Sequence, residues 1–138
     1  MIAEVYNKTN RNILDLKEKI IDFFLFIKED KKINIIFINN SEMQKMNYYY
    51  LKKNYPTDIL TFESNNNDYY LGDIFISLTK SIEQARKFKK TLEEEIIFLS
   101  LHGYLHLKGY NDNTEESFQK MIKLQEEILI KYNNNELI

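Results

Sequence analysis

Residues 91–112 read TLEEEIIFLSLHGYLHLKGYND, and the fold that we expect is organised around this stretch. Thr91 and Glu94 have the spacing of a capping box, which marks the first turn of a helix. The apolar residues that follow predict a helix from Leu92 to about Lys108, and Gly109 is well placed to end it in the left-handed conformation. The sequence therefore predicts a strongly apolar helix with a defined start and end.

Both histidines of the chain, His102 and His106, lie in this predicted helix. Residues four apart project from one face of a helix about one turn (~6 Å) apart, so the two imidazoles can bind one ion. A turn at Gly109 would bring Asp112 near that ion as an oxygen ligand. Two neutral imidazoles, one carboxylate and an open position are typical of catalytic zinc, and we expect one zinc ion (Zn2+) per chain.

Other interpretations of the histidine pair stay open. Two histidines can pack on a helix face with their nitrogens bonded to neighbouring groups. Glu115 and Glu116 are alternative third ligands at the start of the next helix, and the same donor set also forms the facial triad of non-haem iron oxygenases. The chain has no cysteine, so any metal must be held by nitrogen and oxygen.

The rest of the chain predicts alternating strands and helices. Strands are expected at residues 2–7, 33–39 and 69–77, and another follows the only proline, Pro56. Helices are expected at 13–27, from a capping box at Ser41 and Gln44 to about Leu51, at 81–88, and from Asn113 onward. The last helix has a partly apolar face made of Phe118, Met121, Ile122, Leu124, Gln125 and Ile128. We predict one α+β domain spanning residues 1–138, a small mixed sheet packed with several helices and a zincin-like metal helix at 92–108.

Composition limits the possible partners and locations. The formal net charge is −2, so the chain lacks the basic character of a typical nucleic-acid binder, and any such binding must be local. The longest apolar runs are too short to span a bilayer, and the first residues do not resemble a signal peptide. We expect a soluble cytoplasmic protein with no membrane partner.

Three motifs resemble the YbeY family of bacterial metal-dependent rRNA maturation factors. LHGYLHLKGYND at 101–112 is similar to the family pattern HGxLHLxGYDH, PTDILTF at 56–62 to PTDVLSF, and LGDIFIS at 71–77 to LGDIVIS. The resemblance implies a zinc-dependent, single-strand-specific endoribonuclease that matures the 3′ end of small-subunit rRNA and takes part in ribosome quality control. Its implied partners are single-stranded rRNA, the small ribosomal subunit and a ribosome-assembly GTPase.

The resemblance also assigns roles to individual residues. His102 and His106 match the first two metal histidines of the family, and Asp112 stands where the third would be. Leu51 replaces an arginine that faces the cleft in the family, and a leucine cannot hold a phosphate. We therefore consider Lys52, Lys53 and Arg86 as substrate-binding cations in its place.

Further roles concern the surroundings of the metal. Beyond a water activated by the ion, the sequence identifies no catalytic residue, although Glu95 lies on the face of His102 and could orient a histidine. Asp73 could cap a turn or line the cleft, whereas Asp58 after the proline favours a structural turn. Candidate surfaces for base stacking are Tyr48, Tyr49, Tyr50, Tyr55, Tyr69 and Tyr70.

Two other functions remain possible. A metalloprotease of the HExxH type needs glutamate directly after the first histidine, where this chain has Gly103, so peptidase chemistry is disfavoured. Glycine inside a helix is destabilising by about 1 kcal/mol relative to alanine, which indicates a close approach at this position. The second possibility is a ribosome-associated scaffold that keeps the metal but has lost its phosphate clamp at Leu51.

Overall fold

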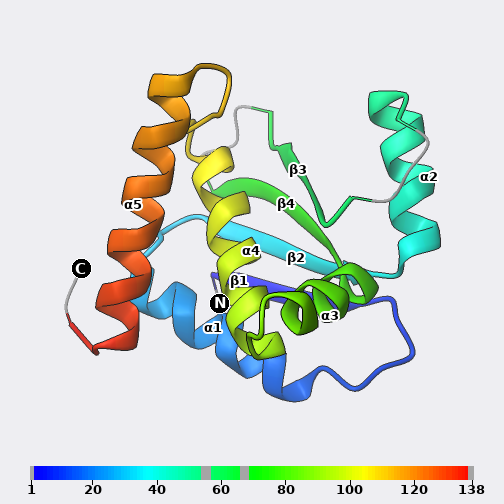
Figure 1. Ribbon diagram of the computed structural model, residues 1–138, viewed down its shortest axis with the longest axis horizontal. Coiled ribbons are helices and arrows are strands. Elements are labelled where there is room, and N and C mark those ends of the chain that lie inside the picture. The colour runs from blue at the N-terminus through cyan, green and yellow to red at the C-terminus, as the bar shows by residue number, and fades with distance from the viewer. Residues whose placement is uncertain (1, 54–56, 66–68, 137–138) are drawn as a thin grey trace.

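A mixed sheet forms the centre of the structure (Figure 1). The computed structural model describes residues 2–53, 57–65 and 69–136. Within them, β1 (Ala3–Asn7), β2 (Lys32–Ile38) and β4 (Tyr70–Ser77) run parallel, and β3 (Ile59–Glu63) pairs antiparallel with β4. The strand order β1-β2-β4-β3 places β3 at one edge. Together with the helices, this confirms the predicted α+β fold.

Helices connect and cover the strands. They are α1 (Leu14–Ile27), α2 (Asn40–Leu51), α3 (Leu78–Lys87), α4 (Leu92–Leu107) and α5 (Glu115–Asn133). Figure 1 shows α4 crossing the face of the sheet, with α5 on one side and α3 on the other, and α2 at the end of the molecule opposite α5. None of the helices in the described ranges is both long and apolar enough to cross a membrane.

The core has two parts because alternate residues of a strand face opposite sides of the sheet. Ile33, Ile35 and Phe37 of β2 point into the main core, which they share with α1 and α4. Ile36 and Ile38 point the other way and pack with Met43 of α2, Leu60 of β3 and their neighbours. Helix α2 therefore covers part of the second face and is held close to the edge strand β3.

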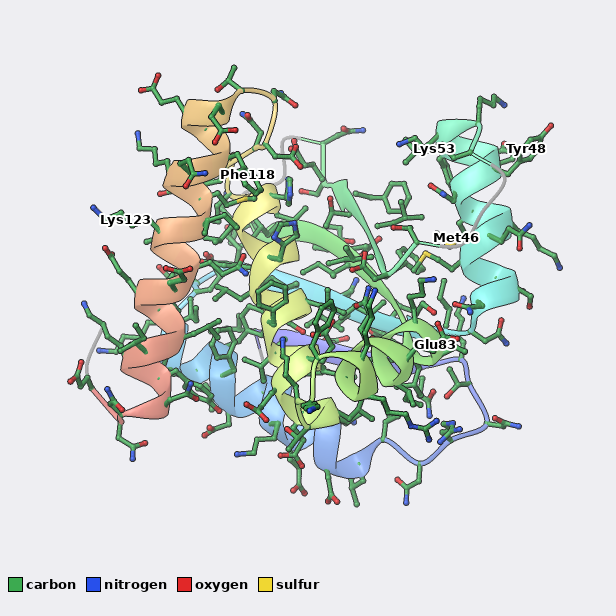
Figure 2. All side chains as sticks on the ribbon, in the orientation of Figure 1. Met46, Tyr48, Lys53, Glu83, Phe118 and Lys123 are labelled. Atoms are coloured by element: carbon green, nitrogen blue, oxygen red, sulfur yellow. The ribbon has the colours of Figure 1, made fainter. Side chains whose placement is uncertain are left out.

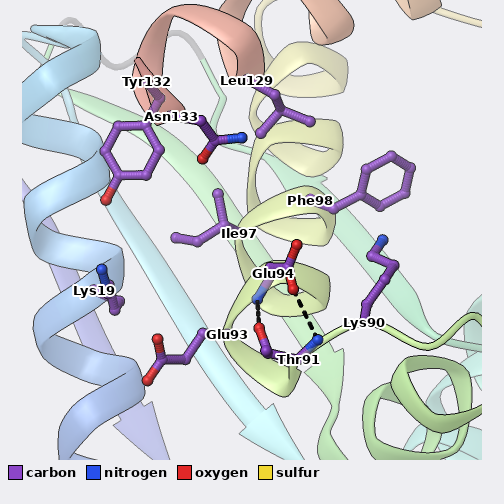
Figure 3. A pocket seen from close by; sticks show the side chains of 10 residues that line it. All are labelled: Lys19, Lys90, Thr91, Glu93, Glu94, Ile97, Phe98, Leu129, Tyr132 and Asn133. Atoms are coloured by element: carbon purple, nitrogen blue, oxygen red, sulfur yellow. Dashed lines mark hydrogen bonds between the residues drawn. The ribbon is translucent and has the colours of Figure 1, made fainter. Parts of the chain in front are cut away.

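The predicted start of α4 is confirmed. The Glu94 backbone N–H donates to Thr91 Oγ1 (3.1 Å), and the Thr91 N–H donates to Glu94 Oε1 (2.9 Å), as Figure 3 shows. The same view shows residues that line a cavity between the start of α4 and the end of α5, among them Lys90 and Tyr132. The volume of this cavity is about 200 Å³. Neither histidine lines this cavity.

Three other helix starts differ from the sequence prediction. Ser41 does not cap α2; Asn39 does, accepting from the Glu42 N–H (3.1 Å), so Ser41 lies inside the first turn. Helix α3 starts three residues early because Ser77 already accepts from the Lys80 N–H (3.1 Å). Thr114, not Asn113, caps α5.

Gly109 ends α4 as predicted. Its φ is 101°, and the Tyr110 N–H donates to the Leu105 carbonyl (3.0 Å) while the Gly109 N–H donates to the His106 carbonyl (3.0 Å). These two bonds form a Schellman motif, which a glycine at this position permits. The chain therefore turns back directly after His106.

Candidate metal centre

The two histidines converge as their spacing predicts. His102 Nε2 lies 3.1 Å from His106 Nε2, and the ring centroids are 4.7 Å apart. Two imidazole nitrogens bound to one tetrahedral zinc at about 2.0–2.1 Å would lie about 3.3–3.4 Å apart. The two side chains thus fit a shared zinc ion with almost no change in position.

Gln125 of α5 sets the tautomer of His102. Its Oε1 lies 3.2 Å from His102 Nδ1, and the Gln125 side chain is almost completely buried. An amide oxygen only accepts, so this contact favours the tautomer with the proton on Nδ1, which leaves the Nε2 lone pair for a metal. A buried partner of this kind fixes the orientation of a metal-binding imidazole.

The partner of Glu95 in the structure is a lysine and not a histidine. The Glu95 carboxylate is buried and accepts from Lys90 Nζ (2.8 Å), whereas His102 is oriented by Gln125. The sequence contained a signal for Gln125, because it is a polar residue that continues the buried spacing of Met121 and Ile128 on α5. Its partner could not be identified without knowing how α5 packs on α4.

His106 is held in the form that binds metal. Burial lowers its pKa, the neighbouring His102 lowers it further, and the Asp112 carboxylate acts in the opposite direction. The net shift is downward, which favours the neutral imidazole that a metal site requires near pH 7.

The third ligand stays a prediction. Asp112 lies close enough to influence His106 but is exposed. Within the described ranges, no group of three or more His, Cys, Asp or Glu side chains is arranged to hold a metal ion. Glu115 and Glu116, the alternative ligands, lie in the first turn of α5. Binding by Asp112 would require its side chain to turn toward the histidines.

A cleft of about 300 Å³ opens beside the histidine pair. Its described lining comes from α4, from the edge strand β3 and from the end of α2, and consists of Tyr50, Leu51, Ile59, Leu60, Thr61, Phe62, His102 and His106. Leu51 belongs to this lining and is 51% exposed, so position 51 faces the cleft. Its wall opposite the histidines is aromatic and aliphatic.

The three candidate cations lie outside the described lining of the cleft. Lys52 has its Nζ 6.0 Å from the centroid of the Tyr48 ring, and Lys53 follows the end of α2, where Figure 2 labels it. Arg86 lies in the last turn of α3. Their role in substrate binding stays a prediction.

Gly103 is required by packing. A methyl group at this position would lie 2.9 Å from Ile59 Cδ1 and 2.9 Å from Ile74 Cγ2, closer than atoms of a folded core approach. Helix α4 therefore lies directly against β3 and β4, which brings the histidines to the edge of the sheet. Any larger residue at this position would displace the Ile59 or Ile74 side chain.

The other candidate residues have structural contacts. The Asp58 carbonyl accepts from the Ser77 N–H (2.9 Å), which continues the antiparallel pairing of β3 with β4. The turn role of the Asp58 side chain stays a prediction. Asp73 accepts from Asn34 Nδ2 (3.0 Å) and from the Tyr70 hydroxyl. Of the candidate stacking residues, Tyr50 lines the cleft, and Tyr55 lies outside the described residues.

Comparison with known proteins identifies the family. The family model described as Endoribonuclease YbeY matches residues 2–133. The chain belongs to the YbeY family. It is 48% identical over 141 residues to Endoribonuclease YbeY of Aster yellows witches'-broom phytoplasma (strain AYWB), covering 98% of this chain and 97% of the relative.

More distant YbeY relatives agree. Endoribonuclease YbeY of Oceanobacillus iheyensis is 36% identical over 138 residues, covering 89% of this chain and 90% of the relative. The solution structure of TM1509 from Thermotoga maritima has a TM-score of 0.61 and 30% sequence identity, covering 96% of this chain and 93% of that one. The family membership thus rests on sequence and on fold.

Proposed function

We propose that this protein is a zinc-dependent endoribonuclease that cuts single-stranded RNA. The observation that carries the proposal is the pair of Nε2 atoms 3.1 Å apart, next to a cleft large enough for part of a nucleotide. The relatives named Endoribonuclease YbeY support the reaction class. We further propose that it matures the 3′ end of small-subunit rRNA in the cytoplasm and takes part in ribosome quality control, with the small ribosomal subunit and a ribosome-assembly GTPase as partners.

The histidines would hold the metal. His102 and His106 offer their Nε2 lone pairs, and Asp112 is the proposed third ligand. Zinc in this position would supply Lewis-acid chemistry, which makes water a better nucleophile near neutral pH and polarises a phosphoryl oxygen. Gln125 keeps the His102 proton on Nδ1, away from the ion. Glu95 is held by Lys90 and contributes to the fold.

The cleft wall would position the RNA strand. Tyr50 is 55% exposed and packs edge-on against Phe62, with their ring centroids 4.9 Å apart. Exposed aromatic rings bind bases of any sequence by stacking, which suits a single-stranded substrate. A base stacked on this wall lies across the cleft from the histidines.

One observation favours a second candidate, a metal-binding ribosome-associated scaffold with little nuclease activity. Leu51 faces the cleft, and no lysine or arginine belongs to the described lining. A substrate phosphate therefore meets no cationic side chain in the described lining. A metalloprotease is less favoured, because Gly103 stands where that class has the glutamate that acts as base.

Cleavage assays before and after chelation test the proposal. Protein purified without added metal is assayed for zinc and incubated with labelled single-stranded RNA, duplex RNA and an unstructured peptide. We expect cleavage of single-stranded RNA only, lost on chelation and restored by zinc. Bound zinc without cleavage, even with small ribosomal subunits present, would favour the scaffold, and peptide hydrolysis would favour the protease.

A further inference from the structure

A polar cavity, separate from the histidine cleft, lies elsewhere on the molecule. It has a volume of about 440 Å³, and its described lining includes Lys8, Thr9, Arg11, Asn39 and Thr79 but no acidic residue. These residues come from the loop after β1 and from the starts of α2 and α3. The cavity therefore combines two cations with hydroxyl and amide groups.

The topology explains the position of this cavity. The parallel strands β1, β2 and β4 end at Asn7, Ile38 and Ser77, so their carboxyl ends meet at one edge of the sheet. In open sheets with parallel strands, ligands bind in the crevice outside these ends. Figure 1 shows the loop after β1 running beneath the start of α2 at that edge.

The loop that carries the cations is fixed by Asn7. Asn7 Oδ1 accepts from the Thr9 N–H (2.9 Å), and Asn7 Nδ2 donates to the Arg11 carbonyl (2.7 Å). The Lys8 N–H also donates to the Phe37 carbonyl of β2 (2.9 Å). Lys8 and Arg11 are thus presented by a defined backbone, and among the ion pairs of the described residues neither takes part.

We propose that this pocket, the Lys8–Arg11 pocket, binds backbone phosphates of the RNA strand that enters the histidine cleft. The inference rests on the proposed function and supplies the phosphate contacts that the described lining of the cleft lacks. In a chain with a net charge of −2, two cations in a cavity without acidic groups form a local anion site. The partial positive charge at the starts of α2 and α3 acts in the same direction.

Helix α2 connects the two sites. Its N-terminal cap, Asn39, lines the Lys8–Arg11 pocket, and its last residues, Tyr50 and Leu51, line the histidine cleft. At 1.5 Å per residue, its twelve residues extend about 18 Å. A stacked strand advances about 3.4 Å per nucleotide, so roughly five nucleotides would span the two sites.

The experiment measures RNA binding as a function of salt, with EDTA present so that no cleavage occurs. The probe is a single-stranded RNA of about twelve nucleotides, long enough to reach both sites. Each phosphate contact on a single strand contributes about 0.7 to the slope of log K against log salt. The double variant Lys8→Ala/Arg11→Ala should lose affinity at low salt and have a slope about 1.4 smaller than the parent.

Two controls make the test specific. Lys123→Ala removes a cation from α5, which lies at the left of the view in Figure 2, and should leave the salt slope unchanged. The exchange Lys8→Arg/Arg11→Lys keeps both charges and should retain most of the slope, which excludes a folding defect of the loop.

The outcomes separate this inference from the proposed function. Three results would overturn the proposed phosphate binding by the Lys8–Arg11 pocket. They are an unchanged salt slope in the double variant, an equal decrease of the slope in Lys123→Ala, and no RNA binding by the parent. A parent that binds RNA through Lys8 and Arg11 but fails to cut it under turnover conditions would leave the pocket supported and refute the nuclease.

Discussion

Replacing Gln125 by leucine should weaken zinc binding although Gln125 is not expected to touch the ion. Leucine has a similar volume and suits a site that is almost completely buried, but it removes the oxygen that accepts from His102 Nδ1. The imidazole proton is then free to move to Nε2, the atom that lies 3.1 Å from His106 Nε2. A protonated Nε2 has no lone pair for the metal.

The expected size follows from the role of such partners. Loss of a hydrogen bond that orients a metal-binding histidine weakens metal affinity by about 10- to 100-fold. At 1.4 kcal/mol for each factor of ten, this corresponds to about 1.4–2.8 kcal/mol of binding free energy. Gln125→Glu keeps an acceptor at this position and should retain tight binding.

Competition with a chromophoric chelator measures the zinc affinity of each variant. Gln119→Leu is the matched control, because Gln119 lies on the exposed side of the same helix and bonds only to Glu115 among the described side chains. The nitrogen chemical shifts of His102 report the tautomer independently. If Gln125→Leu binds zinc as tightly as the parent while the protein stays folded, the assignment of Gln125 is refuted.

Three further predictions concern the cleft, the third ligand and the core. Leu51→Arg should stabilise the transition state of RNA cleavage by about 1.5–3 kcal/mol, which raises kcat/KM roughly 10- to 150-fold. An unchanged kcat/KM would show that position 51 does not contact phosphate. Asp112→Ala should weaken zinc binding while Asp112→His retains it; equally tight binding by Asp112→Ala and loss in Glu116→Ala would identify a different third ligand. Glu29→Gln should lower the free energy of unfolding at pH 7 by about 1–3 kcal/mol, measured by urea denaturation, because the buried carboxylate accepts from Tyr104 Oη (2.8 Å) and Lys108 Nζ (3.1 Å). Burial acts to raise the Glu29 pKa, but the hydrogen bonds of the carboxylate outweigh burial, and the net shift is downward from 4.5. The difference in free energy of unfolding between variant and parent should therefore be present above about pH 4.5 and disappear as the pH falls below it. A difference in unfolding free energy that persists in acid would contradict this.

Local signals were sufficient to predict most of the fold. The capping box at Thr91, the glycine turn at Gly109 and the β-branched run of β2 each depend on neighbouring residues, and each is confirmed. The caps of α2 and α3 were missed for a local reason as well, because Asn39 directly follows β2 and Ser77 is the last residue of β4. Where the same residue can end a strand and cap the next helix, the sequence pattern does not locate the boundary between strand and helix accurately.

The site was predictable only where its contacts are local. His102 and His106 meet because they are one helical turn apart, whereas Gln125 reaches His102 across 23 positions and Ile59 reaches Gly103 from another strand. The sequence suggested a close approach at Gly103, or a need to keep bulk out, but could not identify the neighbour. The Lys8–Arg11 pocket depends on three strand ends meeting at one edge, which is a property of the topology.

Zinc stoichiometry measured by equilibrium dialysis tests the central claim most directly, namely that His102 and His106 share one ion. The parent protein should bind close to one zinc per chain, and His102→Ala and His106→Ala should each lose tight binding, because each removes one of the two nitrogens that converge. Retention of the full zinc content by either folded variant would contradict the account.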